Sequence, residues 1–464
     1  MTAPGPTRSL AEYVAATSYR DLPSTVREAA KGYILDSLAN MIGGARTRPG
    51  RIVLEQFASL GGAPEATIMA TGDRAPALHA AYVNASLSNL EDFDDTYRYI
   101  SHPGATIVPA ALAAGEKRGV SGPDVIAAVV LAYEVSLRVC DAIRPSPERA
   151  AQAWGMSTWQ IFGAATAAAK VQGLEARAVA TAFGHAGMSA PVPFLKKVGT
   201  APEDRPISWL KNNFGWATMG GVLAADLAGA GMHGTESIFD GPTGFWVMAG
   251  SDRCDVDAFT AGLGERYLMV ETGIKPYACC RWTHTALDAA REIVADQRID
   301  PRKIEAIDIV TTTEIRDTFG LTDPVDVQDA QLALPALVAL ELAGYSSAHG
   351  IDADRLRDPL VRDLVGRIRV EASTESDRQF NDERLMPARV TVRMAGGERF
   401  EVAHAIAKGE PELPLGYDQI RAKFLGVTAP VVGPSRAERL AERVDGLERL
   451  ESIGSLLADP AMAR

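Results

Sequence analysis

The chain has 464 residues, of which 47% are hydrophobic and 23% charged, and its formal net charge is −12. This length and globular composition predict one large domain and a smaller one. The acidic balance argues against a nucleic-acid partner and against an anionic membrane surface, because both need a basic face, but it is compatible with a small anionic substrate in a locally basic pocket.

The first half of the chain predicts a succession of helices that are rich in alanine and glycine and apolar on most sides. Helices of this kind lie inside a helical body rather than on its surface. Ser121 is placed to cap one of them, and glycines mark several helix ends. The predicted helices cover residues 9–19, 23–45, 76–93, 105–120, 122–143, 157–174, 175–190 and 212–232.

The pattern changes after about residue 265. Runs rich in Ile, Val and Thr predict strands, and the Gly396-Gly397 pair marks a hairpin. A charged amphipathic helix in the tail is expected to pack back on the helical body. The elements predicted here are an extended segment at 267–277, helices at 285–297, 325–344 and 435–459, and strands within 304–315, 365–373 and 388–406.

These elements predict a mainly α fold with an α+β part. A large all-helical domain would consist of residues 1–265 and 406–464, and a smaller α/β lid domain of residues 266–405. The four cysteines include no CxxC pair, which favours free thiols in a reducing cytoplasm. Because the first residues lack the apolar segment of a signal peptide and no uncharged apolar run reaches ~18 residues, we expect a cytoplasmic protein without a transmembrane helix.

The segment LEDFDDTYRYISHPGA, residues 90–105, concentrates four acids and a histidine. It could be the end of a helix with a solvated acidic face, which is the usual role of a charge run. It could instead bind Mg²⁺ through Asp92, Asp95 and Thr96. In a third interpretation it is an acid–base site, because crowded carboxylates have separated pKa values and His102 titrates near neutrality.

The third interpretation makes Asp92, Thr96 and His102 the candidate site residues. Asp92 and Thr96 are four residues apart and would share a face of a helix, while a loop would have to bring His102 back to them. The other acids of the segment are expected to be capping or solvated groups. They are Glu91, Asp94 and Asp95.

Two basic clusters follow. The segment GIKPYACCRWTHTALDAA contains Lys275, Arg281 and His284, either as surface residues of a strand-to-helix turn or as a clamp that binds carboxylates. A loop rich in Pro and Gly supplies Lys197 and Lys211, either as a solvated surface or as the rim of an anion pocket. Its other basic residues are Lys196 and Arg205.

The segment DFDDTYRYISHPGATIVPAALAAGE, residues 92–116, resembles the signature of the MmgE/PrpD family, which includes 2-methylcitrate dehydratase, cis-aconitate decarboxylase and iminodisuccinate epimerase. Three later segments follow in the order that the family has, so the similarity spans roughly residues 9–430. The resemblance implies a large helical domain, a smaller α/β lid, an active site between them and a homodimer. It also implies small di- or tricarboxylate substrates, proton removal or addition beside a carboxylate, and no metal or organic cofactor.

Residues of this chain fall on the family's site positions. The resemblance implies catalytic roles for Asp92, Thr96, His102 and Lys275. Lys211, Arg281, His284 and Lys197 are the residues expected to bind substrate.

Two positions depart from the pattern of the decarboxylase. A histidine expected shortly before the helix at 157–174 is missing, because Trp154, Gly155 and Met156 stand there, and Ala336 takes the place of a tyrosine. Several dehydratase-like members of the family also carry this histidine. Both departures therefore weigh against decarboxylation of cis-aconitate and against dehydration of methylcitrate, and favour a different substrate or a proton shift. The leading hypothesis is a cofactor-independent lyase, dehydratase-like, or an isomerase. The alternatives are an epimerase or racemase of the iminodisuccinate type, and a non-catalytic protein that binds carboxylates.

Overall fold

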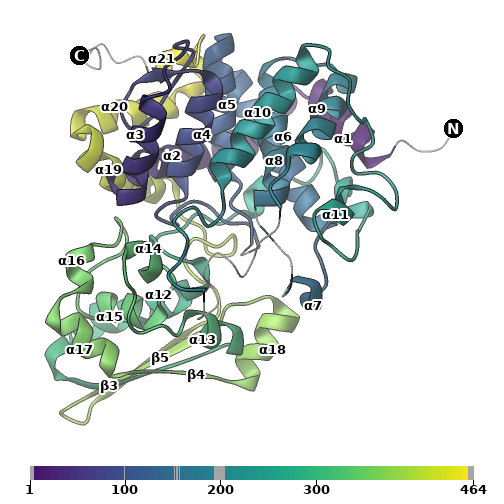
Figure 1. Cartoon of the computed structure of the whole chain (residues 1–464). Coiled ribbons are helices and arrows are strands. Elements are labelled where there is room, and N and C mark those ends of the chain that lie inside the picture. Colours follow the sequence, from purple (N-terminus) through teal and green to yellow (C-terminus); the bar gives the residue numbers. More distant parts are fainter. Residues whose placement is uncertain are drawn as a thin grey trace.

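A computed structural model describes residues 5–98, 100–150, 152, 155, 157–192 and 204–457. The fold is mainly α with an α+β part, as predicted, and Figure 1 shows a helical body above a smaller module built around a sheet. We call these the helical body and the sheet module. Among the described residues, no helix is long and apolar enough to cross a membrane.

The helical body takes its core from long helices whose small residues allow close contact. A Cβ on Gly163 would lie 2.9 Å from a carbon of Ile107, and one on Gly221 would lie 2.6 Å from the Cβ of Ala164, so neither position has room for a larger side chain. The helices of the N-terminal half are α1 (Pro6–Ala16), α2 (Ser24–Gly43), α3 (Arg48–Ala58), α4 (Ala77–Ser88), α5 (Gly104–Arg118), α6 (Gly122–Ala142), α7 (Pro147–Ala150), α8 (Ser157–Val171), α9 (Ala176–Ser189), α10 (Phe214–Gly229) and α11 (Phe245–Met248).

The end of the chain returns to this body. Helix α19 (Tyr417–Val432) and helix α20 (Pro434–Asp445) lie beside α2, as the yellow and purple ribbons in Figure 1 show, and α21 (Gly454–Leu457) follows. The predicted helix at 435–459 is therefore shorter than expected, because α20 ends before Gly446. The predicted packing of the tail on the helical body is confirmed, since Leu440 and Val444 belong to its core.

The sheet module has four strands in the order β4-β3-β5-β6, with β3 parallel to β4 and antiparallel to β5. The hairpin predicted at Gly396-Gly397 joins β5 to β6. The strands are β3 (Ile304–Thr311), β4 (Ile368–Ala372), β5 (Ala388–Met394) and β6 (Arg399–His404); β1 (Ala66–Thr67) and β2 (Arg74–Ala75) form a separate pair in the helical body. The helices are α12 (His284–Gln297), α13 (Thr313–Phe319), α14 (Val327–Ala330), α15 (Leu334–Leu342), α16 (Ala353–Leu356), α17 (Pro359–Gly366) and α18 (Thr374–Glu383).

Two local predictions here were wrong. The segment predicted to be extended at 267–277 contains a short 3₁₀ helix, Leu268–Glu271, because the buried carboxylate of Glu134 on α6 accepts a hydrogen bond from the Met269 amide and holds the turn. The helix predicted at 325–344 is broken into α14 and α15, since Pro335 favours a new helix start and cannot donate to a continuing one.

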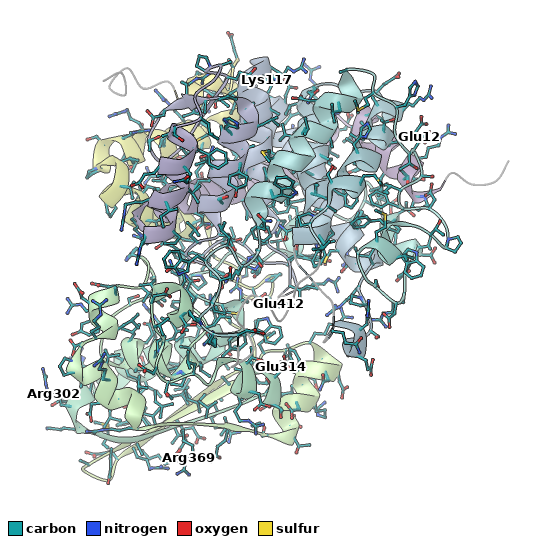
Figure 2. All side chains as sticks on the ribbon, in the orientation of Figure 1. Glu12, Lys117, Arg302, Glu314, Arg369 and Glu412 are labelled. Carbon is teal, nitrogen blue, oxygen red and sulfur yellow. The ribbon has the colours of Figure 1, made fainter. Side chains whose placement is uncertain are left out.

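Charged side chains of both signs cover the outside of both parts, as Figure 2 shows. Glu12 and Lys117 are exposed on the helical body, and Arg302 and Arg369 are exposed on the sheet module. The charges that concern the chemistry are buried instead, at the junction of the two parts.

Candidate active site

The acidic segment is a buried loop, not a helix. Helix α4 ends at Ser88, and Asp92 and Arg98 have φ angles of +48° and +46°, a left-handed conformation that an α-helix does not accommodate. The prediction that Asp92 and Thr96 share a face of a helix is therefore wrong. The loop follows its own path until α5 begins at Gly104.

The expectation that the remaining acids could be solvated was also wrong, although Asp95 does cap a helix, because it accepts a hydrogen bond from the Gly104 amide at the start of α5. Glu91, Asp94 and Asp95 are buried, like Asp92. A buried carboxylate needs a charged or hydrogen-bonded partner, and each of them has one. The Arg46 guanidinium donates to Glu91 Oε1 from Nε and Nη2 at 2.9 and 2.7 Å.

Asp92 lies between two lysines that the sequence separates widely. Lys275 Nζ donates to Asp92 Oδ1 at 2.6 Å and to the Asp92 carbonyl oxygen at 2.7 Å, and Lys211 Nζ donates to Asp92 Oδ2 at 2.6 Å. Burial raises the pKa of Asp92, but the two ammonium groups outweigh it and hold that pKa well below its usual value. For Lys275, burial lowers the pKa, and the Asp92 carboxylate reverses this and raises it. Lys275 is therefore charged although its side chain is fully buried.

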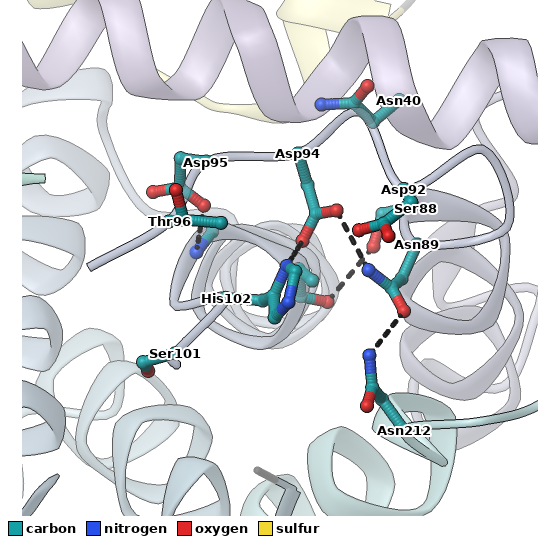
Figure 3. A network of polar contacts seen from close by, with 12 residues as sticks. Asn40, Ser88, Asn89, Asp92, Asp94, Asp95, Thr96, Ser101, His102 and Asn212 are labelled. Atoms are coloured by element: carbon teal, nitrogen blue, oxygen red, sulfur yellow. Dashed lines mark hydrogen bonds and ion pairs between the residues drawn. The ribbon is translucent and has the colours of Figure 1, made fainter. Parts of the chain in front are cut away.

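His102 is oriented by Asp94, as Figure 3 shows. Its Nδ1 lies 2.9 Å from Asp94 Oδ2, and Asp94 Oδ1 accepts a hydrogen bond from Asn89 Nδ2 at 2.8 Å. The Asn89 oxygen accepts in turn from Asn212 Nδ2 at 2.8 Å. Burial raises the pKa of Asp94, but His102 overrides it and lowers that pKa below its usual value. The carboxylate that faces His102 is thus Asp94, which was not among the predicted site residues, and not Asp92.

Gln160 on α8 fixes the backbone of His102. Its Oε1 accepts from the His102 amide at 3.0 Å, and its Nε2 donates to the His102 carbonyl oxygen at 2.6 Å. The imidazole Nε2 has no hydrogen bond to any residue that the structure describes. The ring is therefore held from one side and has one nitrogen available for proton transfer.

Thr96 and Arg281 form a second group beside the first. Thr96 makes a β-bridge with Gly273, two residues before Lys275, and its Oγ1 accepts from Arg281 Nε at 3.1 Å. Arg281 Nε also lies 2.9 Å from Glu410 Oε1, and its terminal nitrogens donate to carbonyl oxygens of the loop before α19. Arg281 was predicted to bind a carboxylate, and here its guanidinium is occupied by this loop.

His284, at the start of α12, lies behind Arg281. Its Nδ1 is 3.5 Å from Arg281 Nη1, and its Nε2 is 3.2 Å from the Cys279 carbonyl oxygen. Burial and the adjacent guanidinium lower the pKa of His284 well below its usual value, so this ring is neutral. Such a group can hold Arg281 in place, whereas it adds no charge for a substrate carboxylate.

Several predicted positions lie outside the described residues. They include Lys197, which was expected to bind substrate, as well as Lys196, Trp154 and Met156. Arg205 is described, and its Nη1 pairs with Asp329 Oδ1 at 3.2 Å. Ala336 is buried within α15.

Three of the buried side chains could bring ligand atoms together for a metal ion. Asp92, Asp94 and His102 each offer one within 4.8 Å of the others. An ion there would have to displace two lysines from Asp92 and compete with His102 for Asp94. The two carboxylates are therefore better matched to the side chains that they already contact. The predicted alternative of Asp92, Asp95 and Thr96 does not form, because Asp95 faces Tyr133 and the start of α5.

Asp95 connects the acidic loop to α5 and to Tyr133 on α6. Tyr133 OH donates to its Oδ2 at 2.7 Å, and the Gly104 amide donates to its Oδ1 at 2.9 Å. Burial raises the pKa of Asp95 to about 8, against 3.8 for an exposed group. The carboxyl is therefore protonated at neutral pH, and it fixes the residue at which α5 starts.

This protonation predicts a stability that depends on pH. Between about pH 4 and pH 8 the folded protein keeps a proton on Asp95 that the unfolded chain has lost, so the free energy of unfolding falls as the pH rises and levels off above about 8. One proton corresponds to about 1.4 kcal/mol per pH unit. We expect Asp95→Asn, whose amide can keep both contacts, to flatten the slope by about this amount in urea unfolding at pH 5 to 8. Equal slopes in the two proteins would mean that Asp95 is ionised.

The sequence analysis missed the residues that link these groups. Asn89 and Asn212 connect Asp94 to the loop before α10, and Gln331 of the sheet module donates to the Leu90 carbonyl oxygen at 2.8 Å. Polar residues inside otherwise apolar stretches, such as Gln160 in STWQIFGAA, were the available signal. A small hollow beside them has a volume of about 10 Å³, and its walls include Asn89, Lys211 and Asn212.

Comparisons with known proteins find matches over most of the chain. Residues 8–254 match the MmgE/PrpD N-terminal domain, and residues 277–449 match the MmgE/PrpD C-terminal domain. A cis-aconitate decarboxylase of Homo sapiens is 24% identical over 467 residues, covering 97% of this chain and 93% of that protein. One from Aspergillus terreus is 24% identical over 479 residues, covering 98% of this chain and 95% of the fungal protein.

Proposed function

Because this chain belongs to the MmgE/PrpD family, we propose that it is a cofactor-independent lyase or isomerase that removes a proton beside a carboxylate of a small di- or tricarboxylate. The observation that carries the proposal is the buried pairing of a histidine held by Asp94 with two lysines gathered on Asp92. A base and two cations in one enclosed site suit the formation of an anion from a neutral C–H bond.

In the proposed reaction His102 Nε2 removes the proton from the carbon beside the carboxylate. Asp94 stabilises the imidazolium that forms, since it already accepts from Nδ1. The electrons of the broken C–H bond move into the carboxylate and give an enolate-like anion, which Lys211 and Lys275 stabilise. In a dehydration, the His102 imidazolium then gives this proton to a hydroxyl on the neighbouring carbon, which leaves as water while the electrons of the anion form the double bond.

The two departures from the decarboxylase pattern favour a substrate other than cis-aconitate. The chain has Ala336 where the decarboxylase has a tyrosine, and no histidine stands at Trp154, Gly155 or Met156. We place dehydration of such a substrate first. Epimerisation is the second candidate. Lys275 provides a cation and His102 a base, and both lie close to the side chain of Asp92.

A panel of acids tests the proposal. Citrate, methylcitrate, aconitate, iminodisuccinate and related acids would be incubated with the enzyme in D₂O and followed by NMR. We expect one of them to lose water and give an alkene. Deuterium entering a substrate that loses neither water nor CO₂ would identify an epimerase instead. An acid that raises the melting temperature without turning over would support a binding protein and contradict the proposed catalysis.

A further inference from the structure

Lys423, on α19 near the end of the chain, is buried beside the active site although none of the proposed steps uses it. Its Nζ donates to the Phe93 carbonyl oxygen at 2.6 Å and to the Lys275 carbonyl oxygen at 2.9 Å. It also pairs with Asp36 Oδ1 on α2 at 2.6 Å. Two of the N–H donors of this ammonium group therefore bond to carbonyl oxygens and its charge pairs with Asp36, so Lys423 contacts three different segments of the chain.

The two carbonyl groups belong to the backbone that carries the site. Phe93 stands between Asp92, which binds the lysines, and Asp94, which binds His102. The second carbonyl is that of Lys275 itself. One ammonium group therefore links the acidic loop to the segment that enters the sheet module. The Phe93 ring lies under the same nitrogen, 3.7 Å from its centroid, and adds a cation–π contact.

Stability alone gives little reason for this arrangement. A buried ion pair is often no more stabilising than apolar residues of similar volume, because two charges lose their hydration. Burial lowers the pKa of Lys423 and raises the pKa of Asp36, which are the directions expected of charges removed from water. The helices around the pair have apolar cores that could have filled this space. What apolar side chains cannot supply is a donor to both the Phe93 and the Lys275 carbonyl oxygens.

We infer that Lys423 is a positioning residue, which holds the backbone of Asp92, Asp94 and Lys275 in register across the junction of the helical body and the sheet module. The inference rests on the proposed function. It makes α19 a third component of the active site. The other two are the acidic loop and the segment around Lys275.

Two single variants separate positioning from ion-pair stability. Lys423→Met and Asp36→Asn both break the same ion pair, but only Lys423→Met removes the donors to the two carbonyl oxygens. We expect Lys423→Met to lower kcat roughly 10-fold or more, because small displacements of catalytic groups have large effects on rate. Asp36→Asn should keep kcat within about threefold of the parent protein, since its lysine can still donate to both carbonyls.

Lys423→Met leaves the buried Asp36 carboxylate without its lysine, and the double variant Lys423→Met/Asp36→Asn also removes that carboxylate's charge. It should recover most of the melting temperature lost in Lys423→Met, while its kcat stays low. Lys31→Met is the matched control, because Lys31 is also a buried lysine of the helical body, paired with Glu28 and Glu448 away from the site. It should lower the melting temperature and leave kcat unchanged. A double variant with normal kcat, or equal losses of kcat in Lys423→Met and Asp36→Asn, would overturn the inference.

A crystal structure of the double variant gives a readout that needs no substrate. We expect the Lys275–Asp92 and His102–Asp94 contacts, now 2.6 and 2.9 Å, to lengthen or break. Unchanged contacts in that crystal structure would overturn the positioning role. If the contacts break and no acid in the panel reacts with the parent protein, the positioning holds and the proposed reaction is what fails.

Discussion

Replacing His102 with alanine is expected to lower kcat by about 10²–10⁴-fold while the protein remains folded, because general acid–base catalysis contributes about that much. The imidazole is fixed on one side by Asp94 and on its backbone by Gln160, and its Nε2 has no hydrogen bond to the described residues. Its loss removes the base without opening the helical core. Steady-state kinetics on the acid identified by the panel, with circular dichroism to follow the fold, measures both effects.

A second histidine–carboxylate pair provides the control. His404 Nε2 lies 2.9 Å from Glu292 Oε2 in the sheet module, and both side chains are partly exposed. His404→Ala should keep the kcat of the parent enzyme, and Asp94→Asn should fall between the two histidine variants. A His102→Ala enzyme with full activity would remove this residue from the mechanism, and an equal loss in His404→Ala would indicate a general effect of histidine removal on the fold.

The acidic segment could be recognised as a candidate site from the sequence, whereas the contacts within it could not be predicted. Like charges in consecutive positions repel, so the acids of the segment had to be solvated or matched by cations, and this marked the segment as unusual. The two lysines that pair with Asp92 are residues 211 and 275, more than 100 positions away in the sequence. No local pattern specifies which lysine reaches which carboxylate, and the choice of Asp94 over Asp92 as the partner of His102 depends on the path of a loop.

The helices also differ in how far the local sequence specifies them. The helix predicted at 122–143 is α6, Gly122–Ala142, because a capping box at Ser121 and a long apolar run specify it locally. The helix predicted at 76–93 ends five residues early, at Ser88. There the backbone turns to place Asp92 on the lysines, so tertiary contacts override the helical preference of the sequence. Helix α19, which carries Lys423, was not predicted, since its role depends on three distant segments.

Lys275→Met is expected to have the largest combined effect on stability and activity of the variants considered. The side chain is fully buried, and its ammonium group donates twice to Asp92. Removing one partner of a buried ion pair costs about 3–5 kcal/mol, because the remaining charge loses its compensation. Lys211 stays on Asp92 and should limit the loss to the lower part of that range. Urea unfolding with unchanged m values measures this loss.

Lys275→Met should also lower kcat, for a reason that is separate from the loss of stability. Removing one group that stabilises a developing oxyanion costs about 10²–10³-fold in kcat. Adding Asp92→Asn to Lys275→Met relieves the uncompensated carboxylate, so the double variant should regain stability and remain inactive. Lys117→Met is the control for removing a lysine from an exposed ion pair, and should change stability by about 0–1 kcal/mol and leave kcat unaltered. Recovery of kcat together with stability in the double variant would mean that Lys275 is a structural residue, and the anion of the proposed reaction would then depend on Lys211 alone.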